Sequence, residues 1–248
     1  MENFILECCV DSVESAIKAQ EGGANRLELC GNLIIGGTSP SIALYEEVRK
    51  HTNIRIHALL RPRFGDFLYT DHEMEILRRE VALFREAGCD GVVIGCLTEE
   101  GELNMPGMQM LLAERGNMSV TLHRAFDVAK DPFKVLEQCK ELGINTILTS
   151  GQKNSVLEGA DLICQLVEKA EGKVDILAGA GVNAAVIEKM LAKTPLTSFH
   201  MSGKVTLDSG MKYRKEGVSM GLPSLSEFEV WQTDPAKVRA ARTVLENA

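Results

Sequence analysis

The feature that most constrains the fold of this chain is one succession repeated along its length: a short apolar or β-branched run, a loop, and a segment with helical periodicity. Such alternation is typical of βα units arranged around a parallel sheet. We identify eight units, and no linker or block of charge divides the chain into halves. Eight units favour a closed barrel over an open doubly wound sheet, which rarely needs so many. We therefore predict an α/β fold, a (β/α)₈ TIM barrel, as a single domain over residues 1–248.

Short β-prone runs define the predicted strands, and capping residues define the helices between them. Asp11 is the predicted N-cap of the first helix, and Pro132 opens a later helix that ends before Gly143. The predicted strands are 4–10, 26–31, 54–61, 91–97, 119–126, 146–151, 175–182 and 198–205. Predicted helices include 12–23, 73–87, 132–142, 155–171, 184–193 and a final helix at 235–247.

One segment departs from the regular pattern. Residues 206–232 lie between the last predicted strand and the final helix, and they are polar and rich in glycine. An irregular connection of this length on a compact domain is usually functional or part of an interface. We expect an irregular C-terminal segment that serves as a lid or as a contact surface.

Charge and cysteine usage limit the classes of protein to which this chain can belong. The formal net charge of −8 argues against a broad nucleic-acid surface, which needs clustered Lys and Arg. No apolar run approaches the roughly 20 residues that cross a bilayer, and the start MENFILECCV is acidic where a secretory signal is basic. The seven cysteines include no CxxC pair and no zinc spacing, which favours reduced thiols. We expect a cytoplasmic protein that binds neither membrane nor nucleic acid.

Polar residues inside the predicted strands point to the mouth of the barrel. Strands buried on both faces should be almost wholly apolar, so each polar residue there needs a reason. The ends of barrel strands carry the functional groups of barrel enzymes, at the C-terminal mouth. A single strand histidine is more often a hydrogen-bonded core residue than a catalyst, but several polar groups converging on one end favour a site. The candidate proton-transfer residues are Glu7, Glu28, His57, His123 and His200.

Arginines and glycine-rich turns at the same end predict a site for an anion. RPRFGDF and LHRAFD supply arginines suited to bidentate capture of a carboxylate or phosphate, although Arg124 can instead pair with Asp127. The turns TSGQ, AGAGV and HMSGK follow the last three strands, where backbone N–H groups hold phosphate in many barrels, although glycine also serves tight turns. The candidate binding residues are Arg61, Arg124, Asp127, Ser150, Gly179, Gly181 and Ser202.

A Glu-x-Cys sequence occurs on each of the first two predicted strands. We expect Glu7-x-Cys9 and Glu28-x-Cys30 to lie at equivalent heights, so that the two thiols approach each other near the mouth. Two thiolates suit a soft ion such as Cu(I), whereas buried free cysteine also acts as a small hydrophobe. Cysteines that face outward or sit in helices, and the methionines of MPGMQM, are expected to pack: Cys8, Cys139, Cys164, Met105, Met108 and Met110.

Several motifs in fixed order resemble those of the CutC copper-homeostasis family. They are LECCVDSVESAIKAQEGGANRLELCGNL, RPRFGDFLYTDHE, LHRAFD, LTSGQ and AGAGV, and the resemblance extends to YRKEGVSM. It implies a cytoplasmic barrel, commonly a homo-oligomer such as a dimer or tetramer, that handles copper. The family's proposed copper-binding cysteines correspond to Cys9 and Cys30.

Three hypotheses follow. The first is a copper-homeostasis protein that binds Cu(I) through Cys9 and Cys30. The second is a TIM-barrel enzyme of unidentified reaction acting on a small anionic substrate, carboxylated or phosphorylated. The third is a scaffold that acts through the surface of residues 206–232.

Overall fold

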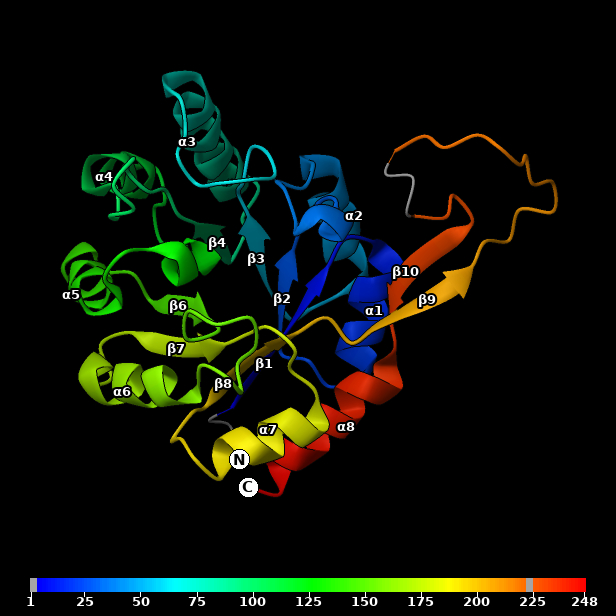
Figure 1. Cartoon of the computed structure of the whole chain (residues 1–248). Helices are drawn as coiled ribbons and strands as arrows, with labels where there is room; N and C mark the ends of the chain where they lie inside the picture. The colour runs from blue at the N-terminus through cyan, green and yellow to red at the C-terminus, as the bar shows by residue number, and fades with distance from the viewer. Residues whose placement is uncertain (1–3, 222–224) are drawn as a thin grey trace.

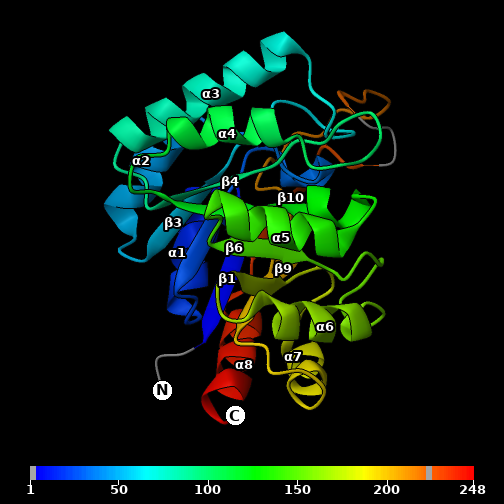
Figure 2. The ribbon, with the colours of Figure 1, turned by 90° about the vertical axis from the view of Figure 1, so that its left-hand side faces the viewer.

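The computed structural model describes residues 4–221 and 225–248 and confirms the predicted barrel. Eight parallel strands each pair with the next, and β8 pairs with β1, so the sheet closes (Figure 1). Helices follow the strands and cover the outside of the barrel, as α3 to α6 do in Figure 2. The barrel strands are β1 Ile5–Val10, β2 Arg26–Leu29, β3 Arg55–Leu59, β4 Gly91–Ile94, β5 Ser119–Leu122, β6 Thr146–Thr149, β7 Asp175–Ala178 and β8 Ser198–Met201.

Side-chain capping fixes where most helices begin. Thr70 and Glu73 form a capping box on α3, and Asp131 caps α5, with Pro132 in its first turn. The predicted N-cap Asp11 is wrong: Ser12 caps α1, because the side chain of Asp11 instead accepts a hydrogen bond from the backbone N–H of the loop after β2. The helices are α1 Val13–Glu21, α2 Ile42–His51, α3 Asp71–Glu86, α4 Met105–Ala113, α5 Pro132–Leu142, α6 Ala160–Ala170, α7 Ala184–Leu191 and α8 Pro235–Glu246.

Successive side chains along each barrel strand face either the surrounding helices or the inside of the barrel. Leu6, Cys8 and Val10 of β1 face the helices and are fully buried in the main apolar core. Each buried aliphatic side chain such as Leu6 or Val10 contributes about 1.5–3 kcal/mol, so this outer layer is a large source of stability. Glu7 and Cys9 face the inside of the barrel, where the polar groups gather. The expected packing of Cys8, Cys139 and Met108 in the core is confirmed.

Several strands end earlier than predicted. The predicted strand 119–126 stops at Leu122, and a 3₁₀ turn, η2 Arg124–Val128, follows with His123 as its N-cap. Because consecutive strand residues point to opposite faces, His123 and Arg124 could not both face the mouth from one strand. The early end of β5 removes that restriction, and both residues reach the mouth.

The predicted strand 198–205 and the irregular segment 206–232 are also corrected. β8 ends at Met201, and β9 Lys204–Asp208 pairs antiparallel with β10 Glu229–Thr233 in a separate two-stranded sheet. This hairpin projects from the barrel beyond α1 (Figure 1). Its base is held by the Nζ of Lys204, 3.2 Å from the ring centroid of Trp231. Residues 222–224 of the predicted segment lie outside the described residues.

No helix in the described ranges combines the length and the apolar character that a membrane span requires.

Candidate functional site

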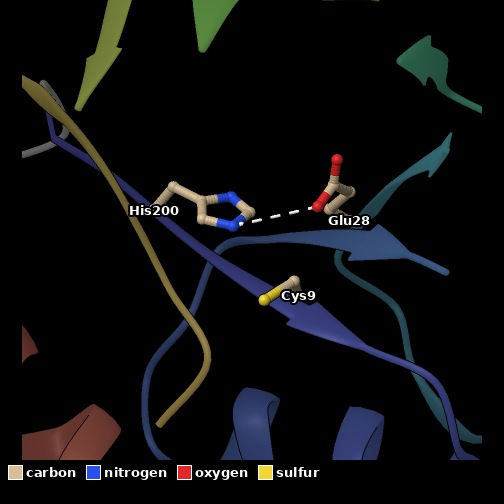
Figure 3. A group of neighbouring side chains, drawn as sticks. All are labelled: Cys9, Glu28 and His200. Atoms are coloured by element: carbon tan, nitrogen blue, oxygen red, sulfur yellow. Dashed lines mark ion pairs between the residues drawn. The ribbon is translucent and has the colours of Figure 1, made fainter. Parts of the chain in front are cut away.

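A thiol, a carboxylate and an imidazole meet inside the barrel near its mouth. Cys9 of β1, Glu28 of β2 and His200 of β8 each offer one ligand atom, and these atoms lie within 4.8 Å of one another. Figure 3 shows the three side chains converging from three adjacent strands. The Cα partners in the sheet are Cys9 with Glu28 and Glu7 with His200, which explains the meeting.

This register overturns one expectation from the sequence. The two Glu-x-Cys sequences do not lie at equivalent heights, because Cys9 pairs with Glu28 and Glu7 pairs with Arg26. The strands are offset by two residues, as the stagger of a closed barrel requires. Glu28, and not Cys30, therefore lies directly beside Cys9.

Cys30 lies one inward position closer to the mouth than Glu28. Its Sγ is 3.6 Å from Oε2 of Glu28, and a Cβ placed at Gly37 would also lie 3.6 Å from it. Burial raises the pKa of the Cys30 thiol well above its ordinary value, and the Glu28 carboxylate raises it further. Cys9 is less buried, with its Sγ 3.7 Å from the carbonyl oxygen of Met201. Of the two thiols predicted to bind copper, Cys9 is the one that the cavity at the mouth reaches.

The groups around His200 favour its protonated form. Its Nδ1 is 2.7 Å from Oε1 of Glu7, and its Nε2 is 3.8 Å from Oε2 of Glu28. Burial lowers the pKa of His200, but Cys9, Glu7 and Glu28 together raise it well above the ordinary value. Burial also raises the pKa of Glu28, which has no arginine within ion-pair distance in the described structure.

Glu7 and His57 lie below the mouth, in a buried polar layer. Burial would raise the pKa of Glu7, but Arg26, whose Nε is 2.5 Å from the Glu7 carboxylate, and then His200 hold it well below its usual range. Burial and then Arg26 lower the pKa of His57 to about 3. Gly91 makes room for this ring, because a Cβ there would lie 2.6 Å from it. Neither Glu7 nor His57 lines the cavity at the mouth.

The cavity at the mouth has a volume of about 540 Å³. Cys9, Glu28 and His200 line one side of it, and Arg61, His123 and Arg124 line another. The second group comes from the ends of β3 and β5, and β5 lies across the eight-stranded barrel from β1. The cavity also touches Gly181 and Ser202 of the loops after β7 and β8, two of the residues predicted to bind an anion.

His123 is buried and uncharged. Its Nδ1 accepts a hydrogen bond of 3.1 Å from the N–H of Ala125, so the proton resides on Nε2. Burial and then Arg61 lower the pKa of His123 to about 3. The ring packs on Phe67, with centroids 4.7 Å apart, and Arg61 lies over the same Phe67 ring.

Asp127 holds the loops after β5 and β6 together. Its carboxylate accepts hydrogen bonds from Arg124, Ser150 and two further groups of the loop, Thr149 and Gln152. The pairing of Arg124 with Asp127 is therefore confirmed, at 2.7 Å. Asp127, Ser150 and Gly179 do not line the cavity, but Asp127 and Ser150 hydrogen-bond to Arg124, which does.

Sequence reasoning missed Arg26, which neutralises Glu7 inside the barrel. The sequence could have shown this, because Arg26 lies two residues before Glu28 and therefore on the same inward face of the strand. It also missed Phe67, which the chain brings back over the mouth from the loop after β3.

Three comparisons identify similar proteins. A model of the CutC family matches residues 4–205. A human protein named copper homeostasis protein cutC homolog is 42% identical over 98% of this chain and 90% of its own length. A Bacteroides fragilis family protein CutC is 45% identical over 92% of each chain. The crystal structure of the putative copper homeostasis protein CutC from Streptococcus agalactiae superposes with a TM-score of 0.77, at 29% identity, over 80% of this chain and 98% of that one.

Proposed function

Because the chain belongs to the CutC family, we propose that it acts in copper homeostasis by binding Cu(I) at the C-terminal mouth of its barrel. The observation that carries this proposal is the convergence of ligand atoms from Cys9, Glu28 and His200 within 4.8 Å. Cys9 supplies the first thiolate, and Cys30, next to Glu28 on β2, supplies the second thiol.

The donor set suits a soft cation better than a hard one. Thiolate and imidazole groups favour Cu(I), whereas Mg²⁺ and Ca²⁺ prefer several oxygen ligands. His200 offers Nε2 to the ion, because Glu7 already holds Nδ1. The ion has to displace a proton from His200 and from each thiol that binds it, so affinity rises with pH. Glu28 balances the added charge.

The test is a titration of reduced, anaerobic protein with Cu(I) against a competing chelator. We expect one ion per chain in the wild type, loss of tight binding in Cys9→Ser and weaker binding in Cys30→Ser. Cys164→Ser is the matched control, since Cys164 is a partly buried helix thiol that lines none of the cavities at the mouth. Unchanged affinity in Cys9→Ser would contradict the proposal.

We also propose that the protein works in the cytoplasm as a homo-oligomer, a dimer or a tetramer. All seven cysteines are free, which suits a reducing compartment. Tyr213 and Met220, between β9 and β10, are strongly exposed and offer apolar surface for a second copy. Light scattering coupled to size-exclusion chromatography measures the mass of the particle in solution. A monomer at all concentrations would refute the proposed homo-oligomer.

A further inference from the structure

We propose that the cavity at the mouth also binds a small organic oxyanion, a carboxylate or a phosphate, whose charged group contacts Arg61, Arg124 and Nε2 of His123. His123 and Arg124 follow β5, which lies across the barrel from β1, and the anion site shares no residue with the Cys9, Glu28 and His200 group. The inference therefore does not depend on copper binding.

The size of the cavity is the first argument. A volume of about 540 Å³ falls within the range of pockets that hold small organic molecules, roughly 300–1,000 Å³. A single metal ion bound by two or three side chains fills only a small part of such a space. The remaining room is large enough for a ligand of molecular size.

Charge is the second argument. Arg61 donates to the backbone carbonyls of Gly36, Gly37 and Gly65, and no carboxylate in the described ranges lies within ion-pair distance of it. Its positive charge therefore remains unneutralised at the mouth of a protein whose formal net charge is −8. Guanidinium groups of this kind bind carboxylate and phosphate oxygens with charge-assisted hydrogen bonds.

Arg124 lines the same cavity and is held in place by hydrogen bonds. Asp127 binds its Nε at 2.7 Å, and the hydroxyl of Ser150 accepts from its Nη2 at 2.9 Å. Two partners on one side of the guanidinium fix its orientation while the side chain still borders the cavity. The same carboxylate also organises the loop after β6, so Arg124 is positioned by a rigid support.

The third argument is an unused hydrogen-bond donor. His123 is only 4% exposed and lines the cavity, yet its Nε2 has no hydrogen-bond partner among the described residues. Because Nδ1 is the acceptor for Ala125, Nε2 carries a hydrogen and can only donate. A buried donor without a partner is costly, and an oxyanion of the ligand satisfies it.

The backbone of the loop after β7 adds to this picture. Ala180 has φ of 78° and Gly181 has φ of 77°, both in the left-handed region, and both line the cavity. Alanine adopts this conformation at a cost, which is more often found where a loop contacts a ligand. Ser202 at the end of β8 adds a hydroxyl to the same rim.

The test uses the copper-free, full-length protein and two probes, inorganic phosphate and succinate. Calorimetry measures the affinity, and the NMR signal of the His123 Nε2–H reports whether the probe reaches that donor. We expect saturable binding of at least one probe, with a shift of the His123 signal. Tighter binding of phosphate would identify the ligand as a phosphorylated compound, and tighter binding of succinate as a carboxylate.

Matched arginine variants show where the anion binds. Arg61→Gln should weaken binding roughly tenfold or more, and Arg61→Lys should retain part of it because the charge remains. Arg63→Gln is the control, since Arg63 lies two residues away, pairs with Asp66 and Glu73, and does not line the cavity. Absence of saturable binding by both probes in the wild type, up to tens of millimolar, overturns the inference. Equal losses in Arg61→Gln and Arg63→Gln overturn it as well.

Discussion

His200 and His123 lie on different sides of the same barrel mouth, and their pKa values are shifted in opposite directions. Both rings are largely buried, and burial lowers the pKa of each. His200 faces Cys9, Glu7 and Glu28, which together outweigh burial and raise its pKa well above the ordinary value. His123 faces Arg61 and a backbone N–H, so it stays neutral.

The difference shows that the neighbours, and not the residue type, decide what each histidine can do. On the His200 side a cation and a thiol stand beside carboxylates, which is suited to exchanging protons for a metal ion. On the His123 side a neutral donor stands beside an unpaired arginine, which is suited to an anion. One cavity of about 540 Å³ thus has two chemically distinct walls.

The largest expected effect comes from removing the carboxylate of Glu7, which contacts His200 and helps to raise its pKa. Glu7→Gln leaves Arg26 and His200 buried without their partner, and breaking a buried pair in this way costs about 3–5 kcal/mol of unfolding free energy. The pKa of His200 should fall, because Glu7 is one of the groups that raise it, and the difference between the two histidines should narrow. Urea unfolding and histidine NMR measure the two results.

Glu47→Gln is the control for that prediction. Glu47 also pairs with a histidine, His51, but the pair is exposed on α2 and should contribute little to stability. Equal destabilisation by the two variants would show that the buried network has no special role.

The contrast between the two histidines also marks the limit of sequence reasoning. The barrel could be predicted because strand and helix periodicity are local signals, and the inward positions of Glu7, Cys9, Glu28 and His200 follow from alternation alone. The partners could not be predicted: Glu7 and His200 are 193 residues apart in sequence, and their contact depends on the closure of the barrel. The stagger between β1 and β2, which puts Glu28 beside Cys9, is likewise a property of the closed sheet.

The second prediction concerns the side of the cavity lined by Arg61, His123 and Arg124. A Cβ at Gly95 would lie 2.7 Å from Cε1 of His123, so Gly95→Ala has to displace the ring. Overpacking of this kind costs roughly 1–3 kcal/mol. The His123 Nε2–H signal should move while that of His200 stays, as measured by NMR together with urea unfolding. Gly210→Ala is the control, because nothing lies within 4 Å of a Cβ there; a displacement of both histidines would contradict the independence of the two walls.

The third prediction concerns pH. The pKa of His123 is about 3 in the folded protein against an ordinary 6.5, so between these values the unfolded chain holds a proton that the folded protein lacks. Stability should therefore fall as pH decreases through this window, by about 1.4 kcal/mol per pH unit for this one group. His200 has the opposite sign, because its raised pKa stabilises the fold at low pH and this contribution is lost as pH rises through that pKa.

Unfolding curves between pH 6 and pH 5 separate the two histidines. In His123→Asn the loss of stability over that interval should be smaller than in the wild type by about 1 kcal/mol. His72→Asn, at an exposed position on α3, is the control variant. An unchanged slope in His123→Asn would mean that His123 is protonated in the folded protein, and the two walls would then be alike in charge.

The smallest expected effect tests what holds His123 in place. Phe67 packs on the His123 ring and lies beneath Arg61, so Phe67→Leu removes an aromatic contact worth about 0.5–1.5 kcal/mol while keeping the site apolar. We expect this modest loss in urea unfolding, together with broadening of the His123 ring signals and no change at His200. Phe64→Leu is the matched control, because Phe64 lies in the same loop with 66% of its surface exposed. If Phe67→Leu instead perturbs His200 as strongly as His123, the two walls are mechanically coupled, and each histidine owes its state to the whole mouth and not to its immediate neighbours.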